Sequence, residues 1–224
     1  MRRPVAWLIR RELRRTFRRV VWIGPPPTLP AGPVVVVANH QSFHDGYLMW
    51  LLALEMLDRR FLVWMEEVDR VPFFALQGAL PFPPNDARRR ATAMRKTRRL
   101  FDETPRTMLA YFPEGALHGA DEPIYPFAPD GLARLHRVLG EPGWWNVAIH
   151  LTWRSDSRPT ALLGGGLVSA APSGDERNQL HDLRAMLRHT AESGRVLLDG
   201  ATRRHERIDL RWASGLFRHR TGRK

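Results

Sequence analysis

Residues 34–45, with the sequence VVVVANHQSFHD, hold four consecutive valines followed by a polar loop. An unbroken β-branched run is typical of a parallel strand that is buried on both faces, whereas a half-exposed strand alternates apolar and polar residues. The apolar segment 45–57 that follows the loop predicts a helix. The stretch therefore indicates a strand–loop–helix unit of an α/β domain.

The same alternation of strands and helices continues along the chain. Strands are expected at 61–65, 79–82, 107–112, 146–153 and 160–168, and helices at 72–77, 86–102, 130–139 and 175–191. This order predicts a single α/β domain with a mixed, mostly parallel sheet flanked by helices. Gly164, Gly165 and Gly166 lack the lysine of a phosphate loop and predict a bulge or a close backbone approach.

The first segment predicts an amphipathic helix, because its apolar residues recur at steps of three and four with arginine pairs on the other sides. The apolar residues of this stripe are Val5, Ile9, Leu13, Phe17 and Val20. Such a stripe packs either on the core of the protein or in a membrane interface, and the one-signed charge keeps the second interpretation open.

Composition shifts divide the chain into four parts. Residues 1–23 are expected to form the basic helix, a membrane-surface anchor, and the Pro/Gly-rich residues 24–33 a linker. Residues 34–200 would then form the domain, and residues 201–224 a basic C-terminal segment.

The formal net charge of +12 is concentrated at the two ends of the chain. Residues 1–19 carry +7 and residues 203–224 carry +6, which leaves about −1 for the rest. Basic patches on an otherwise acidic protein favour an anionic surface, such as phospholipid headgroups or nucleic acid. Nucleic acid is not an expected partner, because no zinc-finger spacing, helix-turn-helix or aromatic RNA motif is present.

The chain has no cysteine, which excludes disulfides, cysteine zinc sites and a catalytic thiol. The longest strongly apolar stretch, residues 47–57, contains Glu55 and is shorter than the roughly 20 residues that a spanning helix needs. We therefore expect a cytoplasmic protein that binds peripherally to the inner face of the cell membrane.

His40 and Asp45 stand at the carboxyl end of the valine strand, where sites in open parallel sheets gather. The loop between them allows the carboxylate to reach one imidazole nitrogen, so that the other can act as a general base. The alternative is structural, with Asp45 or Ser42 capping the next helix. A second strand, 107–112, runs directly into Glu114 and Gly115 and brings an ionisable group to another strand end.

Residues 39–45 (NHQSFHD) and 112–115 (FPEG) resemble the two motif blocks of the glycerolipid acyltransferase family, typified by the 1-acylglycerol-3-phosphate acyltransferases. The resemblance covers roughly residues 30–170. It implies transfer of an acyl chain from acyl-CoA or acyl carrier protein to a hydroxyl of a lysophospholipid or related lipid, with no further cofactor. It also implies that His40 is the general base and Asp45 its orienting partner.

The resemblance further implies that Ser42, Glu114 and Gly115 belong to the acceptor site. Three cations that the family pattern places in this region are absent, since Leu117, Pro84 and the segment 65–67 stand at their positions. Phosphate is best held by bidentate arginine. Either Arg88 and Arg89, with Arg90, take over this role, or the acceptor is a glycolipid, lyso-aminolipid or other hydroxylated lipid without a phosphate there; we favour the second.

His44 and His118 lie in or beside the motif blocks and are possible assisting residues, although hydrogen-bonded loop histidines are the simpler expectation. No metal site is expected, because the His-Glu-x-x-His spacing is absent. Trp144 and Trp145 are expected in the core rather than in an acyl channel. The alternative to an enzyme is a catalytically silent lipid-surface or scaffold protein with the same fold.

Overall fold

The valine run forms β2 (Val34–Ala38), an inner strand of one mixed sheet. The structure is a computed structural model that describes residues 3–70, 72–153, 157–191 and 193–201. All of β2 is buried, because Val34 and Val36 face one apolar cluster while Val35 and Val37 face another. A strand without polar residues is what coverage on both faces requires.

The sheet contains eight strands over the described residues, in the order β4-β3-β5-β2-β6-β7-β1-β8. The remaining strands are β1 (Arg19–Ile23), β3 (Arg60–Met65), β4 (Ala79–Pro81), β5 (Thr107–Tyr111), β6 (Gly143–Thr152), β7 (Thr160–Ser169) and β8 (Arg195–Asp199). Neighbouring strands are parallel except in the pairs β6–β7 and β1–β8. The predicted mostly parallel α/β sheet is confirmed.

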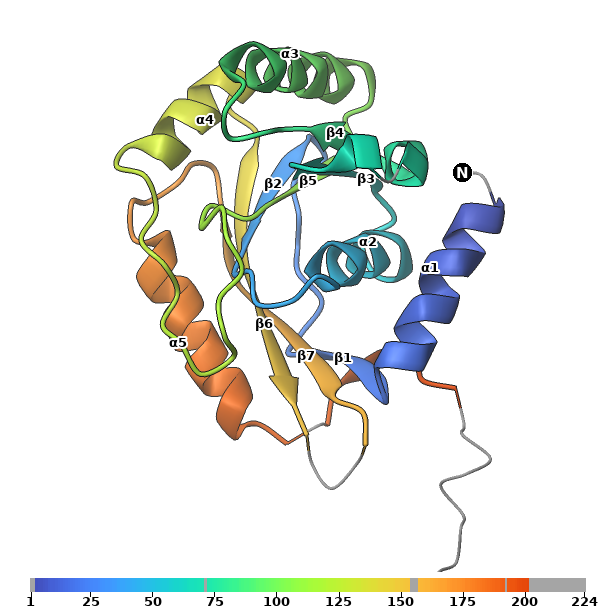
Figure 1. Cartoon of the computed structure of the whole chain (residues 1–224). Coiled ribbons are helices and arrows are strands. Elements are labelled where there is room, and N and C mark those ends of the chain that lie inside the picture. The colour runs from blue at the N-terminus through green and yellow to red at the C-terminus, as the bar shows by residue number, and fades with distance from the viewer. Residues whose placement is uncertain (1–2, 71, 154–156, 192, 202–224) are drawn as a thin grey trace, which may run out of the picture.

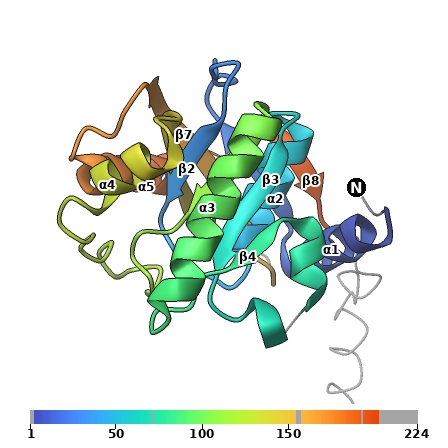
Figure 2. The same cartoon turned by 90° about the horizontal axis from the view of Figure 1, so that it is seen from above.

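Helices cover both faces of the sheet (Figure 1). They are α1 (Arg3–Thr16), α2 (Asp45–Glu55), α3 (Ala87–Glu103), α4 (Gly131–Leu139) and α5 (Glu176–His189), with the short 3-10 helices η1 (Val68–Arg70) and η2 (Pro72–Gln77). The apolar side chains of α1 and α2 join one core cluster, and those of α3, α4 and α5 join the other. Figure 2 shows the same separation from above, with α1 on the side opposite α4 and α5.

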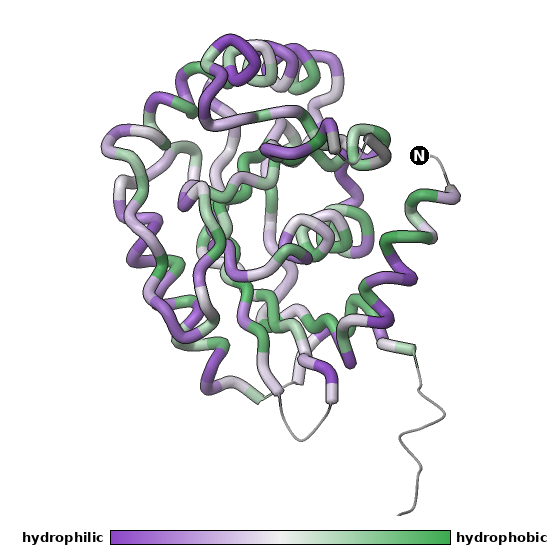
Figure 3. The backbone as a smooth tube through the Cα atoms, in the orientation of Figure 1, coloured by the Kyte–Doolittle hydropathy of each residue, from purple (hydrophilic) through white to green (hydrophobic). Residues whose placement is uncertain are grey.

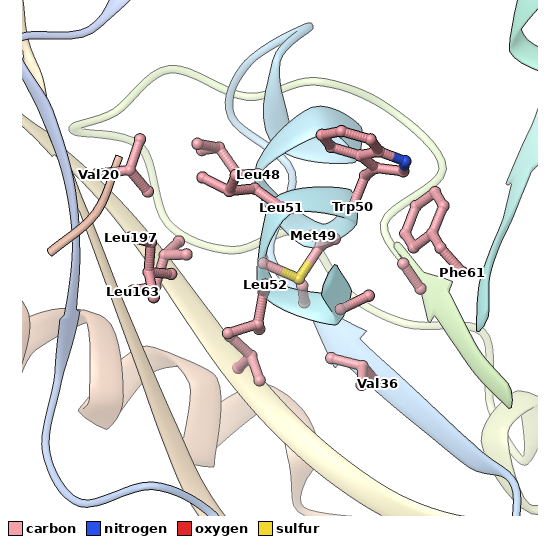
Figure 4. Close-up of a cluster of buried hydrophobic side chains, with 14 of the residues drawn as sticks. Val20, Val36, Leu48, Met49, Trp50, Leu51, Leu52, Phe61, Leu163 and Leu197 are labelled. Atoms are coloured by element: carbon pink, nitrogen blue, oxygen red, sulfur yellow. The ribbon is translucent and has the colours of Figure 1, made fainter. Parts of the chain in front are cut away.

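Helix α2 is buried along most of its length, and this anchors the loop that precedes it. Its residues 48–53 are all buried. Figure 4 shows Leu48 and Leu51 directed toward Val20 of β1, and Trp50 toward Phe61 of β3. Because the helix cannot shift without disturbing this core, the position of its first residue is fixed relative to the sheet.

The N-terminal expectation needs a correction. The helix ends at Thr16, and residues 19–23 form β1, which pairs in parallel with β7 and antiparallel with β8. The apolar stripe, including Leu13 and Phe17, is buried against the core, while Arg11, Arg14 and Arg15 are exposed. Hydrophilic and hydrophobic residues accordingly alternate along α1 (Figure 3). The single helix over residues 1–23 was wrong, because the apolar spacing continues across the helix end into the strand.

The glycine run in β7 behaves as predicted. The pairing of β6 with β7 shifts register between Trp145 and Val147, opposite this run. The ring of Trp145 lies over Gly165, where a Cβ atom would overlap it, and its Nε1 donates to the Gly166 carbonyl at 3.0 Å. Trp144 and Trp145 are both buried in the core.

The basic C-terminal segment expected at residues 201–224 lies outside the described residues except for Ala201. None of the described helices combines the length and the apolar content that crossing a bilayer would require.

Candidate active site

The pairing of β2 with β5 brings the two motif blocks together. These strands are parallel neighbours, with Val37 opposite Tyr111, so the loops after them leave the sheet at the same edge. The ring of His40 stacks on that of Phe112 with a centroid distance of 4.4 Å. The sheet therefore places residues about 75 positions apart in one site, as expected for the carboxyl ends of parallel strands.

His40 and Asp45 form a hydrogen-bonded pair. His40 Nδ1 lies 3.0 Å from Asp45 Oδ2, and the same oxygen accepts from the backbone N–H groups of Gln41 at 2.7 Å and Ser42 at 2.8 Å. Asp45 is fully buried, whereas the His40 side chain is 25% exposed. Since a carboxylate only accepts, Nδ1 carries the proton and Nε2 presents its lone pair. This is the arrangement of a general base with an orienting partner.

A cavity of about 610 Å³ opens beside this pair. Its wall is mostly apolar and includes Trp50, Phe61, Trp64 and Phe74, together with His40 itself. A volume of this size, with an apolar lining and few polar groups, is typical of a small-molecule or lipid site.

Of the two site residues expected in the second motif block, Gly115 lines the cavity and Glu114 does not. Gly115 lines it and adopts a φ of 66°, in the left-handed region that glycine tolerates. Glu114 does not line it: its side chain is 0% exposed, and its oxygens accept from the backbone N–H groups of His40 at 2.7 Å and Tyr125 at 2.8 Å. The role expected for Glu114 in acceptor binding is therefore not supported by its position.

His118 lies beside Glu114 rather than beside the cavity. Its Nε2 is 3.3 Å from Glu114 Oε2, and its side chain is also fully buried. His44 is likewise turned away, with Nε2 3.3 Å from Thr16 Oγ1 of α1. Ser42 Oγ accepts from the His44 backbone N–H at 3.1 Å and so serves the loop. None of these three side chains lines the cavity.

The arginines of α3 are arranged differently from the expectation. Arg88 and Arg89 do not line the cavity, and Arg89 pairs with Asp69 at 2.6 Å. Arg90 does line it, but its guanidinium donates to the carbonyls of Pro83 and Pro84. Arg90 is the one Arg or Lys side chain among the described cavity residues, where it is accompanied by Glu66 and Glu67.

Several residues that line the cavity belong to neither motif block and could not be predicted from the sequence. Ile9 reaches the cavity from α1, and Tyr47 from the first turns of α2. Burial, with a smaller contribution from Glu12, raises the pKa of Tyr47 to about 12, and burial also raises the pKa of Tyr111. Both phenols therefore remain neutral hydrogen-bonding groups at physiological pH. Across the described residues, no three His, Asp or Glu side chains gather to hold a metal.

The fold and the site together define an α/β enzyme with a histidine–carboxylate pair beside an apolar cavity. A sequence model of the Acyltransferase family matches residues 19–139, more than half of the chain. The chain belongs to this acyltransferase family and is an acyltransferase enzyme.

Its fold is similar to that of a solved structure, the 1-acyl-sn-glycerophosphate (LPA) acyltransferase PlsC from Thermotoga maritima. The TM-score is 0.58 at 17% sequence identity, and the similarity covers 84% of this chain and 80% of that chain. At this level of identity the likeness concerns the fold. A comparison with curated proteins finds no match.

Proposed function

We propose that the protein transfers a fatty acyl chain from a thioester donor to a hydroxyl of a lipid acceptor, with His40 as general base and Asp45 as its orienting partner. The observation that carries this proposal is the hydrogen bond between His40 Nδ1 and Asp45 Oδ2, 3.0 Å long, on a ring that lines the apolar cavity. An alcohol is a poor nucleophile until a base removes its proton as attack begins.

The reaction can be written without a covalent acyl-enzyme intermediate. His40 Nε2 takes the proton of the acceptor hydroxyl while the oxygen attacks the thioester carbonyl carbon. The carbon–sulfur bond then breaks, an ester is formed, and the leaving thiolate recovers the proton from His40. Asp45 stabilises the imidazolium between these steps, and the hydrogen bonds to Gln41 and Ser42 hold its carboxylate in place.

The donor in this proposal is acyl-CoA or acyl carrier protein, whose chain would occupy the apolar cavity. The wall formed by Trp50, Phe61 and Phe74 excludes water from that chain. The two donors share the thioester, so a direct comparison of both with one acceptor would identify the preferred one.

The acceptor in this proposal lacks a phosphate beside His40. Leu117 lies on the cavity wall at the position where the family pattern has arginine, and Glu66 and Glu67 also line the cavity. Nη1 of Arg90 donates to two backbone carbonyls. A phosphate monoester would find few cations here, and an anion that leaves water needs paired cations.

The test compares the wild type with His40→Gln in an assay with labelled acyl-CoA or acyl carrier protein and lysolipids with and without phosphate. Loss of the base should lower kcat by about 10²–10⁴-fold. His181→Gln is the matched control, because the His181 side chain is exposed on α5, where it contacts Asp182. Equal activity of wild type and His40→Gln would overturn the role of His40 as the base, and no activity in either would favour the alternative of a catalytically silent lipid-surface or scaffold protein.

We also propose that the enzyme works on the inner face of the cell membrane as a peripheral protein. Because the stripe of α1 is buried, contact would come from exposed apolar side chains on and near the cavity wall. Trp7 and Leu8 of α1 are exposed and directly precede Ile9, which lines the cavity, and Phe43 and Leu117 are themselves exposed on its wall. Arginines on α1 add attraction to anionic headgroups.

A further inference from the structure

We propose that Glu114 and His118 form a buried pair that positions His40 and that neither residue touches the acceptor. This inference rests on the proposed role of His40 as the base. It assigns to Glu114 a task different from the acceptor binding that its motif block implies, and it gives His118 a specific partner.

The pair holds the backbone of His40 on both sides. Glu114 Oε1 accepts the His40 N–H at 2.7 Å, and the His40 carbonyl accepts the N–H of His118 at 3.1 Å. Since the Asp45 hydrogen bond holds the ring, the position of Nε2 depends on both the backbone and the side-chain contacts. A displacement of the loop 113–118 would therefore move the base relative to the reacting carbon.

Contacts at both ring nitrogens fix the His118 side chain. Nδ1 lies 2.8 Å from the Gly119 carbonyl oxygen, and because a carbonyl only accepts, Nδ1 carries a proton. Nε2 lies 3.3 Å from Glu114 Oε2 without the alignment of a hydrogen bond. The ring is therefore packed against the carboxylate that accepts the His40 N–H.

The pair is surrounded by Arg184, Glu122 and Tyr125. Arg184 of α5 is buried and donates to the Glu122 carbonyl at 2.6 Å. Glu122 is exposed and accepts from the Gly119 N–H at 3.0 Å and the Tyr125 hydroxyl at 2.9 Å. The ring of Tyr125 lies 5.6 Å from that of His118. Arg184 also interacts electrostatically with Glu114, so a guanidinium lies near this buried carboxylate.

Burial separates this role from acceptor binding. The side chains of Glu114 and His118 are both 0% exposed and neither lines the cavity. Both Glu114 oxygens are already engaged by backbone N–H donors. An acceptor hydroxyl would have to displace these donors, and the loop would have to open first.

The kinetic test uses Glu114→Gln and His118→Gln, with Asp121→Asn as the matched control on the same loop, because the Asp121 side chain is exposed and lies 4.0 Å from Arg188. Misplacement of the base should lower kcat on the order of 10²-fold while KM for the acceptor stays within about twofold. Asp121→Asn should leave both constants near wild type. A rise in KM at unchanged kcat in Glu114→Gln would overturn the proposal and restore the acceptor-binding role.

A double substitution tests whether the two residues act as one unit. If they do, Glu114→Gln combined with His118→Gln should lose about as much kcat as the more damaging single change. Losses that multiply would overturn the coupling. Circular dichroism of each variant checks that the fold is retained.

Nitrogen-15 resonances of the histidine rings in the wild-type protein give a readout that requires neither a variant nor activity. We expect Nδ1 of His118 to carry a proton, as its contact with the Gly119 carbonyl requires, and a tautomer with its proton on Nε2 alone would overturn the arrangement of the pair. This result is independent of the His40→Gln assay. If His40→Gln is fully active while Nδ1 of His118 is protonated, the proposed function fails and the pair remains.

Discussion

One carboxylate oxygen organises the loop between β2 and α2. Asp45 Oδ2 accepts from the His40 ring and from two backbone N–H groups of the loop, so the turn closes around it. The His40–Asp45 contact was predictable from the sequence, because both residues lie within one short loop. The burial of Glu114 was not, since the direction of its side chain depends on the path of the chain from 115 to 125.

Leu117→Arg should change the preference of the enzyme between acceptors with and without phosphate. Leu117 is 52% exposed and lines the cavity, so Leu117→Arg would place a guanidinium there without filling the core. One charge-assisted hydrogen bond should shift the ratio of rates toward a phosphate-bearing lysolipid by about tenfold relative to a phosphate-free one.

Acylation rates measured with the two lysolipids test this directly. Leu167→Arg is the control, because Leu167 is exposed on β7 and does not line the cavity. An unchanged ratio in Leu117→Arg would contradict the proposed reason for the missing phosphate site.

Helix α1 shows what the pattern of one element reveals and what it leaves open. Its apolar spacing predicted the helix and its apolar face but left open whether that face packs on the core or in a membrane interface. The same spacing continued through Phe17 and Val20 and concealed the change to β1. Strand β1 is specified by partners far along the chain, including Ala161 of β7 and Leu198 of β8. Such nonlocal pairing leaves no signal in a short window of sequence.

Substitution of two residues of α1 should affect different properties, stability for Leu13 and membrane binding for Trp7. Leu13 is fully buried, so Leu13→Ala should lower the free energy of unfolding by about 2–5 kcal/mol. Trp7 is 58% exposed, so Trp7→Ala should change it by about 0.5 kcal/mol or less but weaken binding to anionic vesicles.

Urea denaturation measures the loss of unfolding free energy, and vesicle sedimentation measures the loss of membrane binding. Trp7→Ala combined with Leu8→Ala should weaken vesicle binding further than Trp7→Ala alone. Sedimentation of the double variant equal to that of wild type would count against membrane contact through α1.

The whole molecule is a sheet between two helical layers, and this much followed from the order of apolar segments. The strand order did not, because β5 inserts between β3 and β2, and β1 inserts between β7 and β8. The charge pattern of the sequence revealed the arginine cluster on α3 but not its distance from the site. Most of these arginines lie outside the cavity.

The three tyrosines give a prediction for the molecule as a unit. The pKa of Tyr47 rises to about 12 through burial and Glu12, burial raises that of Tyr111, and the hydrogen bond to Glu122 raises that of Tyr125. The folded state therefore favours the neutral phenols. Their contribution to stability is fully present below a pH of about 10 and is lost as the pH rises toward about 12.

Tyrosinate absorbance should accordingly titrate at higher pH in the native protein than in urea. The urea midpoint should fall over the same alkaline range, and Tyr47→Phe should reduce that fall. Coinciding titration curves for the native and unfolded protein would show that the three phenols are not held neutral by the fold.

The position of β1 has a consequence for synthesis on the ribosome. Residues 19–23 emerge early, yet their partners at 160–164 and 195–199 are translated last among the described strands. Ala201 N–H also donates to the Arg14 carbonyl at 2.9 Å, so the far end of the described chain closes on α1. The nascent chain must therefore carry β1 unpaired until residues 160–164 have been translated, and a membrane or chaperone would meet its apolar side chains before the sheet covers them.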